Sequence, residues 1–135
     1  MARHILAVDD EFYIRRLLEV NLQRAGYRVT MAGDGQEALD QIQRELPDMV
    51  LLDVMMPRVD GFEVLRRLKA DPRTAGIPVL MLTAKAQDAD IFHGLRAGAD
   101  FYLTKPFNPQ ELLIWVSRVS SQSDPEKAKA GRYQL

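Results

Sequence analysis

The chain has no cysteine, only two histidines and a single tryptophan among its 135 residues. Without cysteine it can form no disulfide, no thiolate metal site and no thiol nucleophile. No apolar run approaches the ~20 residues needed to cross a bilayer, and the first four residues do not open a signal peptide. We therefore expect a cytoplasmic protein that has no membrane partner.

An excess of charge of either sign is also missing. Eighteen lysines and arginines face 19 aspartates and glutamates, which gives a formal net charge of −1. This balance gives no reason to expect direct binding to nucleic acid. The 47% of hydrophobic and 27% of charged residues are ordinary for a soluble globular protein, and the length suits one domain.

Short apolar runs that suit strands alternate with amphipathic helix patterns along this domain. Strands are expected at 4–8, 27–31, 49–53, 78–83 and 101–103, and helices at 14–26, 35–46, 61–68, 88–97 and 109–119. Asn108 has the position of an N-cap for the last helix, on which Ile114 should face water. The periodicity ends there, so we expect a domain at 1–120 and a polar tail or truncated linker at 121–135.

Five alternations of strand and helix predict a parallel sheet covered by helices on both faces. The common topology at this size is the doubly wound, flavodoxin-like (βα)5 three-layer sandwich with strand order 2-1-3-4-5. Ligands of such sheets bind outside the carboxyl ends of the strands, where the strand order reverses. The residues that end each expected strand are therefore the candidates for a functional site.

Four strand ends carry polar residues: Asp9 and Asp10, Asp53, Thr83, and Lys105. Three neighbouring carboxylates repel one another unless a cation lies among them, and Mg²⁺ is the usual hard ion with oxygen ligands. A lysine and a threonine hydroxyl opposite the metal can hold phosphoryl oxygens. Because an aspartate can attack phosphorus and form an acyl phosphate, these ends predict phosphoryl chemistry.

Four motifs resemble those of response-regulator receiver domains, and the resemblance covers about residues 3–120. They are Val8-Asp9-Asp10-Glu11, Leu51-Leu52-Asp53-Val54-Met55-Met56-Pro57, Leu82-Thr83-Ala84 and Lys105-Pro106-Phe107. The resemblance implies that a histidine kinase or a phosphotransfer protein passes a phosphoryl group to Asp53. It also implies no enzyme activity beyond the chain's own phosphorylation and dephosphorylation.

The resemblance assigns further roles to individual residues. Asp10, Asp53 and the backbone carbonyl of Met55 would hold Mg²⁺, and Asp9 would complete the acidic pocket. Thr83 and Lys105 would engage the phosphoryl oxygens, Thr83 and Tyr102 would act as the switch, and the peptide bond before Pro106 would be cis. The switch would change the face made by the helix at 88–97, the strand at 101–103 and the last helix.

Three other functions fit these residues less well. A phosphohydrolase with an aspartate nucleophile needs a second aspartate where Met55 stands, and an FMN carrier needs a phosphate-binding loop where Asp9-Asp10-Glu11 stands. An interaction module that works without phosphorylation would not need all the matched positions, and none of them is lost. The output partner or effector domain stays open.

The oligomeric state stays open too, as monomer or phosphorylation-dependent dimer. Ile91, Phe101 and Trp115 replace the charged residues through which receivers attached to winged-helix domains dimerise, which puts that particular dimer in doubt. A bulky apolar Met55 should not orient an attacking water, so we expect a long-lived phosphoryl group.

Overall fold

Five short strands form one parallel sheet in the order β2-β1-β3-β4-β5, as the sequence predicts. The structure is a computed structural model that describes residues 3–56, 58–83 and 98–121. The strands are β1 (His4–Val8), β2 (Arg28–Ala32), β3 (Met49–Asp53), β4 (Val79–Thr83) and β5 (Phe101–Thr104). The order reverses between β1 and β3, which pair with Val8 opposite Leu52.

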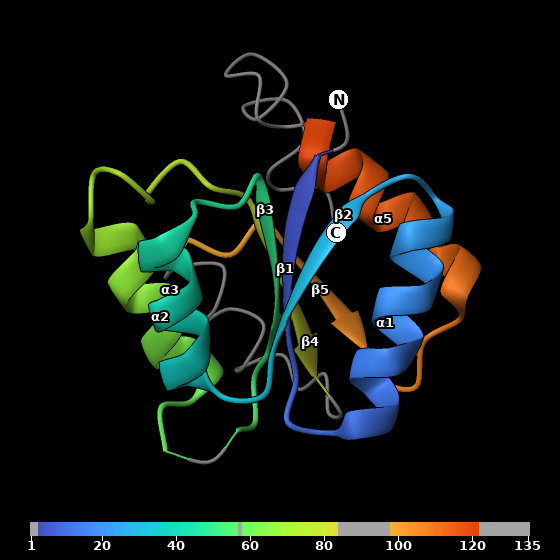
Figure 1. Ribbon diagram of the computed structural model, residues 1–135, viewed down its shortest axis with the longest axis horizontal. Coiled ribbons are helices and arrows are strands. Elements are labelled where there is room, and N and C mark those ends of the chain that lie inside the picture. The colour runs from blue at the N-terminus through green and yellow to red at the C-terminus, as the bar shows by residue number, and fades with distance from the viewer. Residues whose placement is uncertain (1–2, 57, 84–97, 122–135) are drawn as a thin grey trace.

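Helices cover both faces of the sheet, with α1 and α5 on one side and α2 and α3 on the other (Figure 1). Their bounds are α1 (Phe12–Arg24), α2 (Gly35–Arg44), α3 (Gly61–Ala70) and α5 (Pro109–Ser121). The helix expected at 88–97 lies outside the described residues. No helix in the described part of the chain is both long and apolar enough to cross a lipid bilayer.

The core has two halves, one on each face of the sheet, because alternate residues of a strand point to opposite faces. Leu6, Val50 and Leu52 pack with α2 and α3, whereas Ile5 and Leu51 pack with α1 and α5. The central strands β1, β3 and β4 are buried along their whole length. Their continuous apolar sequences follow from this burial on both faces.

Side-chain N-caps begin α2 and α5. Asp34 accepts a hydrogen bond from the amide of Glu37 at 2.8 Å and so caps α2. Asn108 accepts one from the amide of Gln110 at 2.8 Å at the start of α5, which confirms its expected capping role. Ile114 on α5 is 53% exposed, also as expected.

Two local expectations were wrong. The helix expected at 35–46 ends at Arg44, and Leu46, an apolar residue expected in its last turn, lies beyond it and is 47% exposed. Pro47 disfavours a helical conformation in the residue before it. The second strand begins at Arg28 instead of Tyr27, whose amide donates to the carbonyl of Leu22 at the end of α1.

Candidate functional site

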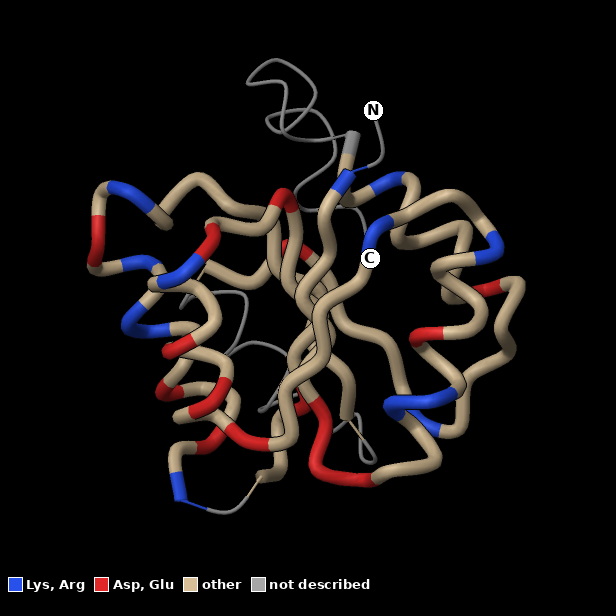
Figure 2. Tube along the Cα trace, viewed as in Figure 1, with Lys and Arg blue, Asp and Glu red and all other residues tan. Residues whose placement is uncertain are grey.

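The ends of β1 and β3 bring Asp9 and Asp53 together at the carboxyl edge of the sheet. Both side chains are buried, with Asp9 fully covered and Asp53 3% exposed, while Asp10 is exposed. One carboxylate oxygen from each of these three residues lies within 4.8 Å of the other two. Figure 2 shows this acidic segment of chain where the central strands finish. The three carboxylates are therefore neighbours in the fold, as expected from the sequence.

Lys105 brings a positive charge to this cluster from the end of β5. Its Nζ lies 2.5 Å from Oδ2 of Asp9 and 3.4 Å from Oδ1 of Asp53, so it joins the two buried carboxylates. It also lies 4.0 Å from Oε1 of Glu11. The peptide bond between Lys105 and Pro106 is cis, as the resemblance implied.

The remaining candidates lie on the same edge. Thr83 ends β4 and is buried, one residue beyond Leu82, which pairs with Asp53. The amide of Met55 donates to Oδ1 of Asp53 at 3.3 Å, and the Met55 side chain is 74% exposed. Tyr102 is 7% exposed and packs in the half of the core that faces α2 and α3. Its predicted role as a switch stays a prediction.

Glycine at position 61 lets the loop after β3 close against the phosphoacceptor candidate. A Cβ on Gly61 would overlap the carbonyl oxygen of Asp53 and lie 2.9 Å from the Cα of Val54. The amide of Gly61 donates to the Val54 carbonyl at 3.0 Å. In the sequence this glycine indicates only the start of a helix, because a close backbone approach has no signal in a single sequence.

Burial and charge set the protonation of the cluster. Burial, followed by the nearby charge of Asp9, raises the pKa of Asp53 to about 7, although Lys105 opposes this rise. Burial alone would lower the pKa of Lys105, but its two carboxylate partners outweigh burial and hold that pKa above its ordinary value. The cluster thus holds more negative charge than Lys105 neutralises.

This excess of buried negative charge fits a divalent cation. The donors of Asp9, Asp10 and Asp53 are all carboxylate oxygens, which hard ions such as Mg²⁺ and Ca²⁺ prefer. Asp10 is exposed, so an ion bound there would stay open to water and to an incoming phosphoryl group. The residues present therefore suit Mg²⁺.

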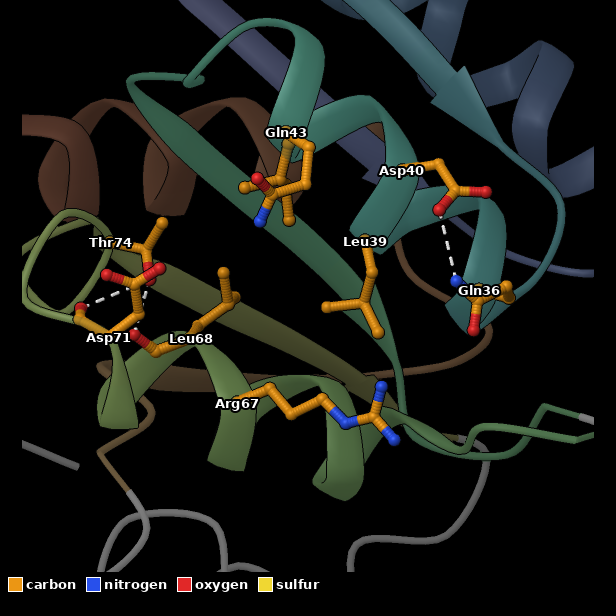
Figure 3. A pocket seen from close by; sticks show the side chains of 9 residues that line it. Gln36, Leu39, Asp40, Gln43, Arg67, Leu68, Asp71 and Thr74 are labelled. Carbon is orange, nitrogen blue, oxygen red and sulfur yellow. Dashed lines mark hydrogen bonds between the residues drawn. The ribbon is translucent and has the colours of Figure 1, made fainter.

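A groove lies elsewhere on the molecule, away from the acidic cluster. This groove of about 270 Å³ runs between α2 and α3, where Leu39 and Leu68 point into it from the two helices (Figure 3). Gln36 and Asp40 hydrogen-bond to each other at 3.0 Å along its rim. None of the predicted site residues lines this groove.

The order of the sheet and the residues at its carboxyl edge define a class of phosphoryl-accepting signalling domain. A family profile described as the response regulator receiver domain matches residues 5–117, and the chain belongs to this family. It is a receiver domain of two-component response regulators, which are generally signalling proteins.

Two curated bacterial regulators are similar to this chain. The chain is 46% identical over 124 residues to the alkaline phosphatase synthesis transcriptional regulatory protein PhoP of Bacillus subtilis, covering 92% of this chain and 51% of that protein. It is 46% identical over 127 residues to the DNA-binding dual master transcriptional regulator RpaA of Synechocystis, covering 93% and 53%. The chain thus spans about half the length of these curated relatives.

A solved structure shares the fold along nearly its whole length. The chemotaxis protein CheY4 of Vibrio cholerae superposes with a TM-score of 0.85 at 39% identity. The match covers 88% of this chain and 99% of that one. The doubly wound fold predicted from the sequence is confirmed.

Proposed function

We propose that the chain accepts a phosphoryl group on Asp53 from the phosphohistidine of a histidine kinase or a phosphotransfer protein. The observation that carries this proposal is the buried pair of Asp9 and Asp53, joined by Lys105 and completed by Asp10. A carboxylate oxygen of Asp53 attacks phosphorus, the bond from phosphorus to the donor histidine breaks, and an acyl phosphate remains on Asp53.

The chain's own residues orient this transfer. Asp9, Asp10, Asp53 and the carbonyl of Met55 would hold Mg²⁺, which when bound neutralises charge on the phosphoryl oxygens. The ammonium of Lys105, already 3.4 Å from Asp53, moves from the carboxylate to a phosphoryl oxygen. The hydroxyl of Thr83 donates to another one. The chain in this way catalyses its own phosphorylation and dephosphorylation.

The phosphoryl group adds about 1.5–2 negative charges next to buried groups, and this change biases two arrangements of the signalling face. Among the described residues that face includes β5 and α5, where the rings of Phe101 and Trp115 stack with centroids 3.8 Å apart. Tyr102 and Thr83 are the candidate switch residues. A coupling free energy of about 1–3 kcal/mol would suffice for a useful signal.

Output is proposed to pass to an attached domain or a separate partner. One relative is named as DNA-binding and another as a transcriptional regulator, and this chain spans about half of each. If residues 121–135 are the start of a linker, a DNA-binding output domain would follow, and the receiver itself would still contact no nucleic acid. We place the protein in the cytoplasm, where ATP-dependent kinases form phosphohistidine.

The proposal is tested by incubating the chain with acetyl phosphate and Mg²⁺ and measuring its intact mass. The wild type should gain the mass of one phosphoryl group, and Asp53→Ala should gain none. Asp60→Asn, on the same loop outside the cluster, serves as a control that removes a carboxylate but keeps an N-capping side-chain oxygen, and it should be phosphorylated. A wild type without added mass, or a modified Asp53→Ala, would contradict the proposal.

A further inference from the structure

Each polar group of Asp9 has a partner, through a hydrogen bond at three of them and through an ion pair at Oδ2. Its amide donates to the carbonyl of Ala32 at 3.1 Å, and its Oδ1 accepts from the amide of Glu11 at 2.9 Å. Its Oδ2 contacts Lys105, and its backbone carbonyl accepts a hydrogen bond from Nη1 of Arg15 at 2.8 Å. Among the residues that the structure describes, Arg15 is the one partner that is a side chain from outside the acidic cluster and Lys105.

The carbonyl of Asp9 belongs to the same rigid peptide plane as the amide of Asp10. A hydrogen bond that fixes this carbonyl therefore fixes the direction in which the chain enters Asp10. The side chain of Asp10 is exposed, unlike the buried side chains of Asp9 and Asp53, so its position depends on its backbone more than on packing. Arg15 thus acts on the most exposed of the three carboxylates.

The surroundings of Arg15 leave room for this contact. Arg15 lies in the first turn of α1 and is half-buried, and its guanidinium lies against Gly33 in the loop after β2. A Cβ on Gly33 would lie 3.1 Å from Nη1 and 3.7 Å from Cζ of Arg15. Any larger residue at position 33 would press on the guanidinium that holds the Asp9 carbonyl.

We propose that Arg15 is a positioning residue for divalent-cation binding, acting through the peptide that joins Asp9 and Asp10. The inference rests on the proposed function, since it concerns the same Mg²⁺. Charge and position predict opposite results when Arg15 is removed. If its positive charge alone mattered, Mg²⁺ would bind more tightly without it, because like charges repel. If it positions Asp10, Mg²⁺ would bind more weakly.

The test compares Arg15→Met with Arg16→Met by Mg²⁺ titration of the unphosphorylated full chain, followed by backbone amide NMR. Arg16 lies on the same helix, is exposed and pairs with Glu19, so its variant removes the same charge without touching Asp9. Outer-shell partners of metal ligands typically contribute on the order of tenfold or more to affinity. We expect a loss of about tenfold for Arg15→Met and no loss for Arg16→Met. Unchanged or tighter binding in Arg15→Met would overturn the inference.

A second variant keeps Arg15 itself and protects the test if Arg15→Met fails to fold. Gly33→Ala should weaken Mg²⁺ binding in the same direction but by less, because its new methyl group would lie 3.1 Å from Nη1 of Arg15 and press the guanidinium away from its present position. In the double variant that carries both Arg15→Met and Gly33→Ala, the two losses of Mg²⁺ affinity should not add, since both act through the hydrogen bond from Arg15 to the Asp9 carbonyl. Fully additive effects, or wild-type affinity in Gly33→Ala, would count against the shared route through Arg15.

Failure of this inference and failure of the proposed function give different results. A wild type that binds no Mg²⁺ would contradict the proposed function together with the role of Arg15. A wild type that binds Mg²⁺ as tightly as Arg15→Met would contradict the role of Arg15 alone. At saturating Mg²⁺, Arg15→Met should regain the wild-type rate of phosphorylation by acetyl phosphate, because only positioning for the ion is lost.

Discussion

Replacing Asp53 by asparagine should stabilise the metal-free protein at pH 8, although it removes the proposed phosphoacceptor. Asp53 is 3% exposed and shares Lys105 with the fully buried Asp9. Burial and the charge of Asp9 raise the pKa of Asp53 to about 7. The folded protein therefore holds an ionised Asp53 less favourably than the unfolded chain does.

The size of the effect follows from linkage. A rise in the pKa of Asp53 from its ordinary 3.8 to about 7 corresponds to about 4 kcal/mol. Below the unfolded pKa, Asp53 is protonated in both states and the penalty is absent. As the pH rises towards 7 the unfolded chain loses its proton first, so the folded state loses stability. Because asparagine only approximates a protonated carboxyl group, we expect a gain of about 2–4 kcal/mol at pH 8.

The assay is urea unfolding followed by circular dichroism, with chelator present and the pH varied from about 4 to 8. Asp40→Asn is the matched control, because it removes one exposed carboxylate outside the cluster. Added Mg²⁺ should stabilise the wild type and leave Asp53→Asn nearly unchanged. If Asp53→Asn gains no stability at pH 8, or gains the same amount at pH 4, the argument from buried charge is refuted.

Three further outcomes are expected. Gly61→Ala should destabilise the fold by about 1–3 kcal/mol in urea unfolding because its methyl group overlaps the Asp53 carbonyl, whereas Gly76→Ala has open space and should cost far less. Burial lowers the pKa of His4, so the unfolded chain takes up this proton first as the pH falls below about 6.5, and His4 then lowers the unfolding free energy. Because Asp53 acts in the opposite direction over this range, the check is the difference between His4→Gln and the wild type, which should grow in favour of His4→Gln as the pH falls below about 6.5. Met55→Asn, at an exposed position, should shorten the phosphoryl lifetime measured by intact mass without loss of thermal stability, and an unchanged lifetime would reject the proposed effect of Met55.

The fold could be predicted from the sequence because its signals are local and repeated. Buried parallel strands need continuous apolar runs such as Met49–Leu52, and the helices between them need one apolar face. Caps such as Asp34 and Asn108 mark helix starts through hydrogen bonds that span only two or three residues. The error at Leu46 arose because its apolar character continued a helical pattern past the point where Pro47 ends it.

The identity of the site residues could also be predicted, since the carboxyl ends of parallel strands meet at one edge. Their pairing could not. Lys105 lies closer to Asp9 than to Asp53, and this preference depends on the reach of a side chain across two strands. The hydrogen bond from Arg15 to the Asp9 carbonyl had no signal in the sequence, because a half-buried helical arginine is common on protein surfaces.

The sequence by itself determined the strand order, the edge of the sheet that carries chemistry, and the residue types gathered there, because each depends on short-range patterns and general rules of chain topology. The tertiary structure alone decided which side chains touch. It brought residues up to about a hundred positions apart into contact, buried Asp9 and Asp53 beneath Lys105, and closed Gly61 against the Asp53 carbonyl. Burial and proximity are what raise the pKa of Asp53 towards neutrality, and neither is a property of any local stretch of sequence.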